Sequence, residues 1–77
     1  MIEITSPDTH GITRIKVDGI ERYTIQPLKM RATAVEYYGQ DVEYAVRPVA
    51  HMSGEWFYLS ESDALAKAMD QVGKYYL

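Results

Sequence analysis

Cysteine is absent from this chain of 77 residues, and histidine occurs only twice. The lack of cysteine excludes both a disulfide-stabilised scaffold and a thiolate metal site. The two histidines, His10 and His51, lie far apart, and neither has a carboxylate or a second histidine at metal-ligand spacing. We therefore interpret both as surface or loop residues and expect no bound metal.

Long apolar runs and the common catalytic motifs are also missing. No run approaches the roughly 18 apolar residues of a membrane span, and the first residues, MIEITSPDTH, lack the basic and apolar regions of a signal peptide. The scattered glycines form no phosphate-binding loop, and no serine lies in a G-x-S-x-G motif. These absences lead us to expect a soluble, cytoplasmic protein that is not an enzyme and holds no cofactor.

The chain does have the composition of an ordinary globular domain, with 47% apolar and 25% charged residues. Its length allows a single domain over residues 1–77. So short a chain buries only about 60% of its unfolded surface. Association into a homodimer is one way in which it could gain further burial.

Alternation and turn residues predict strands in the first part of the chain. MIEIT alternates isoleucine with polar residues, and the turn-forming residues of SPDTHG indicate a loop. A hairpin should follow around Asp18-Gly19. Because facing residues share a side of the sheet, and the apolar residues of both arms have odd numbers, we expect a three-residue loop. This loop pairs Lys16 with Ile20 and holds Gly19 at positive φ.

The segment LKMRATAVEYYGQDVEYAVRP predicts a second hairpin, because the even-numbered residues of both arms are apolar. A loop at GQD that pairs Tyr38 with Val42 preserves this match. Pro48 should end the second arm, since proline cannot donate to the ladder. A helix over residues 27–38 is the competing interpretation, but its charges would oppose the helix dipole, so we favour the strand.

The stretch GEWFYLSESDALAKAMDQVGKYYL, residues 54–77, predicts a strand that turns into a helix. EWFYL is aromatic and β-prone. Ser60 is a good N-cap, with acidic residues in the first turn after it, and Leu59 and Ala64 occupy the positions of a weak hydrophobic staple. Gly73 should stop the helix. The apolar residues at helical spacing, which should pack over Trp56 or Phe57, are Leu65, Ala68, Met69 and Val72.

These patterns together predict an α+β domain: a small antiparallel sheet of four to six strands with one C-terminal helix packed on one face. Each residue of SESD then has a structural role at the start of the helix. Glu61 and Asp63 are paired carboxylates, but at the exposed start of a helix they need no catalytic role.

The charges are unevenly distributed along the chain. The formal net charge is −3, yet residues 14–31 carry +3 and residues 36–63 carry −5. If the two segments occupy different faces, the protein is electrically two-sided. Charges at alternate strand positions are also typical of the solvated face of a sheet, and both interpretations stay open.

Tyrosine is abundant, with seven residues, and it is favoured both in small cores and in protein interfaces. One hypothesis is a binding module for another protein or a protein–nucleic acid complex, through an acidic, tyrosine-bearing surface. Its candidate residues are Glu36, Tyr37, Asp41, Glu43, Glu55 and Glu61. The alternative is a small nucleic-acid-binding protein that uses the basic hairpin over residues 12–31, with Tyr23 available for stacking. The negative net charge and a sequence pI near 5.2 favour the first hypothesis.

The layout resembles the small, often acidic inhibitors carried by bacteriophages, of which the anti-CRISPR proteins are the best-known group. The resemblance rests on the short length, the absence of cysteine, the small antiparallel sheet and a helix entered through WFYLSESDALAKAM. These inhibitors share no common motif, so no functional residue is carried over. The resemblance implies a non-enzymatic inhibitor that binds a host defence complex inside a bacterial cell.

Overall fold

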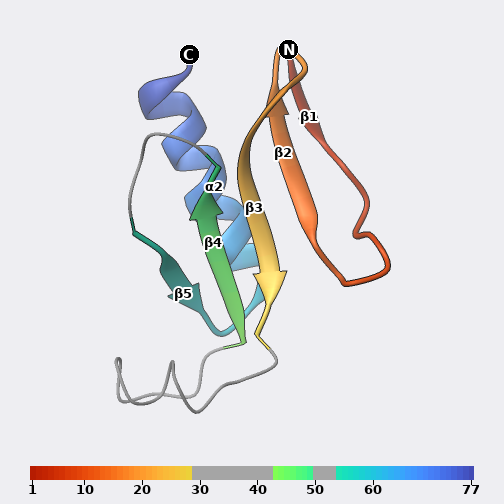
Figure 1. Cartoon of the computed structure of the whole chain (residues 1–77). Helices are drawn as coiled ribbons and strands as arrows, with labels where there is room; N and C mark the ends of the chain where they lie inside the picture. The colour runs from red at the N-terminus through yellow and green to blue at the C-terminus, as the bar shows by residue number, and fades with distance from the viewer. Residues whose placement is uncertain (29–42, 50–53) are drawn as a thin grey trace.

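An antiparallel sheet of five strands, covered on one face by a helix, forms the fold of the described residues (Figure 1). The structure is a computed structural model that describes residues 1–28, 43–49 and 54–77. The strands are β1 (Ile2–Ile4), β2 (Thr13–Val17), β3 (Ile20–Pro27), β4 (Tyr44–Pro48) and β5 (Trp56–Tyr58), and the helix is α2 (Glu61–Tyr75). The strands lie side by side in chain order. The predicted α+β class, strand number and C-terminal helix are confirmed.

The first hairpin has the predicted partners but a different loop. Val17 faces Ile20, so Asp18 and Gly19 alone form the turn, both at positive φ (53° and 81°). This two-residue turn matches the twist of the strands, and the predicted three-residue loop is wrong. Odd residues still face odd residues farther along, because the register shifts by one between Ile15 and Lys16 and leaves Arg22 as a β-bulge.

The second predicted hairpin is corrected in its pairing. β4 pairs with β3 on one side and with β5 on the other, so its strand partners differ from the predicted one. Pro27 is the last residue of β3, and the Leu28 N–H donates to the Glu43 carbonyl at 2.8 Å. A helix therefore does not begin at Pro27; the rest of that prediction, with the GQD loop, lies outside the described residues. Pro48 ends β4 as expected.

Helix α2 begins as the sequence predicts and ends later. The Ser60 hydroxyl accepts the Asp63 N–H at 3.2 Å, and the acidic residues Glu61 and Asp63 occupy the first turn. Gly73 lies within the helix and has no positive φ, so the predicted stop there is wrong. The helix continues to Tyr75 because Tyr76 closes it: the Tyr76 N–H donates to the Val72 carbonyl, and its ring packs edge-on against Tyr23.

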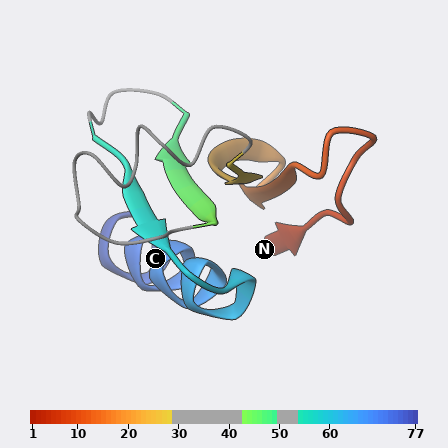
Figure 2. The same ribbon diagram turned by 90° about the horizontal axis from the view of Figure 1, so that it is seen from below.

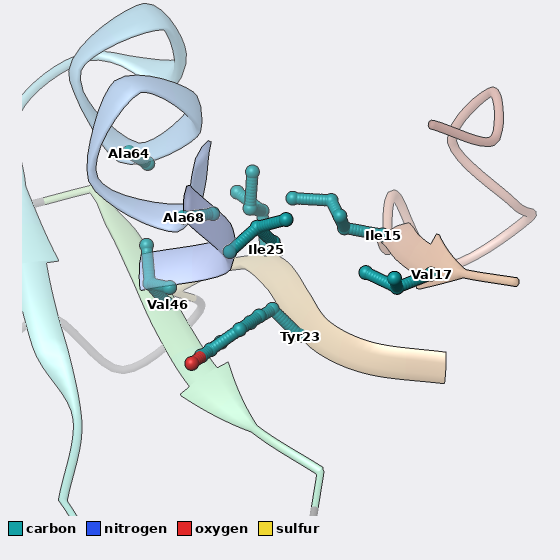
Figure 3. Packing of buried hydrophobic residues seen from close by; sticks show 8 residues of the cluster. Ile15, Val17, Tyr23, Ile25, Val46, Ala64 and Ala68 are labelled. Atoms are coloured by element: carbon teal, nitrogen blue, oxygen red, sulfur yellow. The ribbon is translucent and has the colours of Figure 1, made fainter. Parts of the chain in front are cut away.

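The core lies between α2 and the inner face of the sheet (Figures 2 and 3). The most buried positions of the helix are Ala64, Ala68, Gln71 and Val72, whereas Leu65 and Met69 are only partly buried. Because these alanine side chains are small, the helix can pack close to β3, β4 and β5. Trp56 packs against this core, and Lys67 lies 5.1 Å above its ring, so Trp56 is a structural residue.

Candidate functional site: an acidic end

The six residues predicted to bind a partner differ in their surroundings. Glu36, Tyr37 and Asp41 lie outside the described residues. Glu55 is an ion-pair partner, because its carboxylate accepts the Arg47 Nε–H at 2.8 Å on the outer face of the sheet. Glu43 and Glu61 are exposed.

Glu43 and Glu61 come to the same end of the molecule through the pairing of β4 with β5. The Glu43 N–H donates to the Tyr58 carbonyl at 3.0 Å, which places the start of β4 beside the end of β5. Only Leu59 and Ser60 separate Tyr58 from the first residue of α2 (Figure 1). We call Glu43, Leu59, Glu61 and Asp63 the acidic end.

Leu59 gives the acidic end an apolar centre. Leu59 directly follows Tyr58, whose carbonyl accepts the Glu43 N–H, so its backbone lies near Glu43. The Leu59 side chain is 58% exposed although it is strongly apolar, whereas Ala64 is fully buried. Leu59 is therefore not buried against the helix, as the predicted hydrophobic staple would require. No pattern in the sequence distinguishes this exposed leucine from one that packs against the helix.

The electrostatics of the acidic end are set by the start of the helix. Glu61 and Asp63 lie where the helix dipole is positive, which stabilises two neighbouring carboxylates. Burial raises the pKa of the Tyr58 hydroxyl, and the negative charges of Asp63 and Asp70 raise it further. Exposed carboxylates around an apolar side chain can bind lysine or arginine side chains of a partner.

The basic residues of the hairpin in the alternative hypothesis lie in different parts of the structure. Arg14 already pairs with Asp8 at 2.8 Å and with Glu21 at 3.1 Å. The hydrogen bond from Arg14, with a second from the Ile12 N–H, lowers the pKa of Asp8 to about 2. This network fixes the loop between β1 and β2, so Arg14 has a structural role.

Arg22 lies away from Arg14 because of the bulge. Its guanidinium lies 4.6 Å above the Tyr76 ring, close to the end of α2, where a cation also complements the helix dipole. Its Nε is buried without a hydrogen-bond partner. Lys16 and Arg14 are on the outer face of the sheet, whereas Arg22 contacts Tyr76, the residue that follows α2. These three cations do not form one surface.

Other kinds of site find no support within residues 1–28, 43–49 and 54–77. No three metal-binding side chains lie together there, and His10 is an exposed loop residue whose N–H donates to the Asp8 carboxylate. His51 lies outside these residues. In the same part of the chain no helix has both the length and the apolar character to cross a membrane.

No protein-family model, curated protein or solved structure matches the chain.

Proposed function

We propose that this protein is a non-enzymatic binding module whose acidic end contacts a basic surface of another protein. The observation that carries the proposal is the exposure of Leu59 at the end of the molecule that also exposes Glu43, Glu61 and Asp63. An apolar anchor within a charged rim is the usual arrangement of a protein interface. The charges steer the encounter, and the leucine supplies buried apolar area in the complex.

A protein that handles nucleic acid is the partner class with the best chemical fit. Sites for phosphates are rich in lysine and arginine, and an acidic surface can occupy them in place of the nucleic acid. This chemistry agrees with the resemblance to bacteriophage inhibitors of the anti-CRISPR type. We accordingly propose an inhibitor of a nucleic-acid-handling defence complex, acting in the cytoplasm of a bacterial cell.

Capture from a bacterial lysate, with matched variants as bait, tests this proposal. The test variant is Glu43→Lys/Glu61→Lys, and the control variant is Glu55→Lys/Asp70→Lys. All four residues are exposed, and both variants move the formal net charge from −3 to +1. We expect a partner that is retained by the parent and the control and lost by the test variant. Retention by the test variant, or loss by the control alone, would place the interface elsewhere.

Competition with nucleic acid then tests the partner class. If the acidic end occupies a phosphate site, an oligonucleotide that binds the captured partner should displace this protein, and the parent should displace the oligonucleotide. Simultaneous binding of both would contradict the proposal that the acidic end replaces nucleic acid.

Truncation of the apolar anchor provides a separate test. Leu59→Ala should speed dissociation from the partner about fivefold or more, equivalent to about 1 kcal/mol. Val49→Ala is the matched control, because Val49 is also an exposed apolar residue, at 44%. Both substitutions should leave stability within about 0.5 kcal/mol of the parent. Equal dissociation rates for the two variants would show that Leu59 is not an anchor.

A further inference from the structure

The outer edge of β1 presents backbone groups that no described strand pairs. Among the strands that the structure describes, β2 is the only neighbour of β1. The Thr5 N–H donates to the Arg14 carbonyl, and the Met1 carbonyl accepts the Asp18 N–H, so these residues direct their backbone groups toward β2. Antiparallel pairing alternates along a strand. The backbone groups of Ile2 and Ile4 therefore point away from β2.

The inner side of β1 is apolar and lies outside the cover of the helix. Ile2 and Ile4 face Val17 and Ile15, so they share the core side of the sheet. Ile15 is fully buried, whereas Ile4 is 46% exposed. Helix α2 packs on β3, β4 and β5, and Figure 2 shows β1 at the opposite margin of the sheet from β5.

The side of α2 that faces away from β5 continues this apolar strip. Lys67, on one side of the helix, lies over Trp56 of β5. Leu65 and Met69 occupy the other side by helical spacing, and both are partly buried against the core. A strand added beside β1 would cover the exposed part of Ile4 and lengthen the sheet on the side away from α2.

Glu3, which faces Lys16 of β2 on one side, is the charged residue that an added strand would meet on the other. Its side chain is exposed on the outer face, between Ile2 and Ile4. A second copy paired antiparallel along all of β1 would set Ile2 against Ile4 and Glu3 against Glu3, and like charges directly opposite each other destabilise a sheet. A segment with lysine or arginine opposite Glu3 gains a favourable cross-strand pair instead.

We propose that the edge of β1 accepts an extended segment of a partner protein as an additional antiparallel strand. The segment carries a basic residue opposite Glu3 and apolar residues on either side of it, which lie over the strip next to Ile2 and Ile4. This is binding by strand addition, in which the backbone gives affinity and alternate side chains give specificity. The proposal is independent of the acidic end.

Two synthetic peptides test the proposal by NMR on the 15N-labelled protein. The first is acetyl-Thr-Val-Lys-Val-Thr-amide, and the second has glutamate in place of lysine. In the free protein the Ile2 and Ile4 amides should exchange rapidly with solvent, whereas the Thr5 amide should be protected. We expect the lysine peptide to shift and protect the Ile2 and Ile4 amides, and to bind about 2- to 10-fold more tightly than the glutamate peptide at low salt.

The variant Glu3→Lys tests whether the charge of Glu3 determines the peptide preference. It should reverse the preference, so that the glutamate peptide binds more tightly, while protection of the Thr5 amide reports that β1 remains paired with β2. Equal binding of both peptides, or shifts confined to Glu43 and Glu61, would overturn the proposal. Protection of the Ile2 and Ile4 amides by self-association of the unmixed protein would overturn it in favour of a second copy.

Discussion

Replacing Ala64 with leucine tests where the helix meets the sheet. Ala64 is fully buried near the start of α2 and belongs to the hydrophobic core. Leucine adds three carbon atoms to a position without free space. Overpacking of this kind costs about 1–3 kcal/mol. Ala66 lies two residues on and is exposed, so Ala66→Leu makes the same chemical change outside the core.

The expected difference is large for a domain of this size. A chain of 77 residues has a free energy of unfolding of about 4–12 kcal/mol, and each 1 kcal/mol lost lowers Tm by about 4–8 °C. Ala64→Leu should therefore lower Tm by about 5–20 °C, and Ala66→Leu should keep the free energy of unfolding within about 0.5 kcal/mol of the parent. Circular dichroism at 222 nm during thermal and urea unfolding measures both quantities.

This substitution also separates the observed helix orientation from the one predicted by sequence. The apolar spacing predicts that the buried face of the helix consists of Leu65, Ala68, Met69 and Val72. In the structure the buried residues are Ala64, Ala68, Gln71 and Val72. Equal melting of Ala64→Leu and Ala66→Leu would refute the observed orientation. Greater loss in Ala66→Leu would show that the helix is rotated.

Three further predictions concern Gly73, the Asp8–Arg14 pair and nucleic-acid binding. Gly73→Ala should stabilise the protein by about 0.5–1 kcal/mol in urea unfolding, since Gly73 is helical and a Cβ there meets no atom within 4 Å; destabilisation would contradict its placement within the helix. The Asp8 pKa is about 2 in the folded protein and ordinarily 3.8, so the stability that Asp8 contributes is present above pH 4 and lost as pH falls toward 2. Asp8→Asn should make the acid-induced decrease in Tm shallower in that range, and an unchanged pH profile would count against the Arg14 pair. Fluorescence anisotropy with labelled DNA and RNA should show no binding at physiological salt. Tight binding that weakens steeply with salt would support nucleic-acid binding by the basic hairpin instead.

Local patterns predicted most of the fold, because strands and helix here follow from residues near one another. The N-cap at Ser60 depends on the next three residues, and the strand end at Pro48 depends on proline itself. The hairpin loop was missed because a bulge at Arg22, and not a longer turn, restores the odd-to-odd pairing. Either device satisfies the pattern, and the preference of Asp-Gly for a two-residue turn decides between them.

The errors come from contacts between distant parts of the chain. Gly73 would be a reasonable helix stop in isolation, but the packing of Tyr76 against Tyr23 and Arg22 extends the helix past it. The position of β4 between β3 and β5 is likewise a property of the whole sheet.

The candidate site was predictable only in part. Acidity of residues 36–63 is visible in the sequence, but the neutralisation of Glu55 by Arg47 depends on cross-strand neighbours. The grouping of Glu43 with Glu61 depends on the pairing of β4 with β5. The exposure of Leu59 could not be predicted, because an apolar residue before a helix is ordinarily packed against it.

The association rate of the parent and the Glu43→Lys/Glu61→Lys variant with the captured partner tests the central claim most directly. The acidic end should steer association, so the parent rate should fall steeply as salt rises. The variant should associate about tenfold or more slowly at low salt, depend less on salt, and melt at the same temperature as the parent. Equal association rates for parent and variant at every salt concentration would show that the acidic end is only a solvated surface.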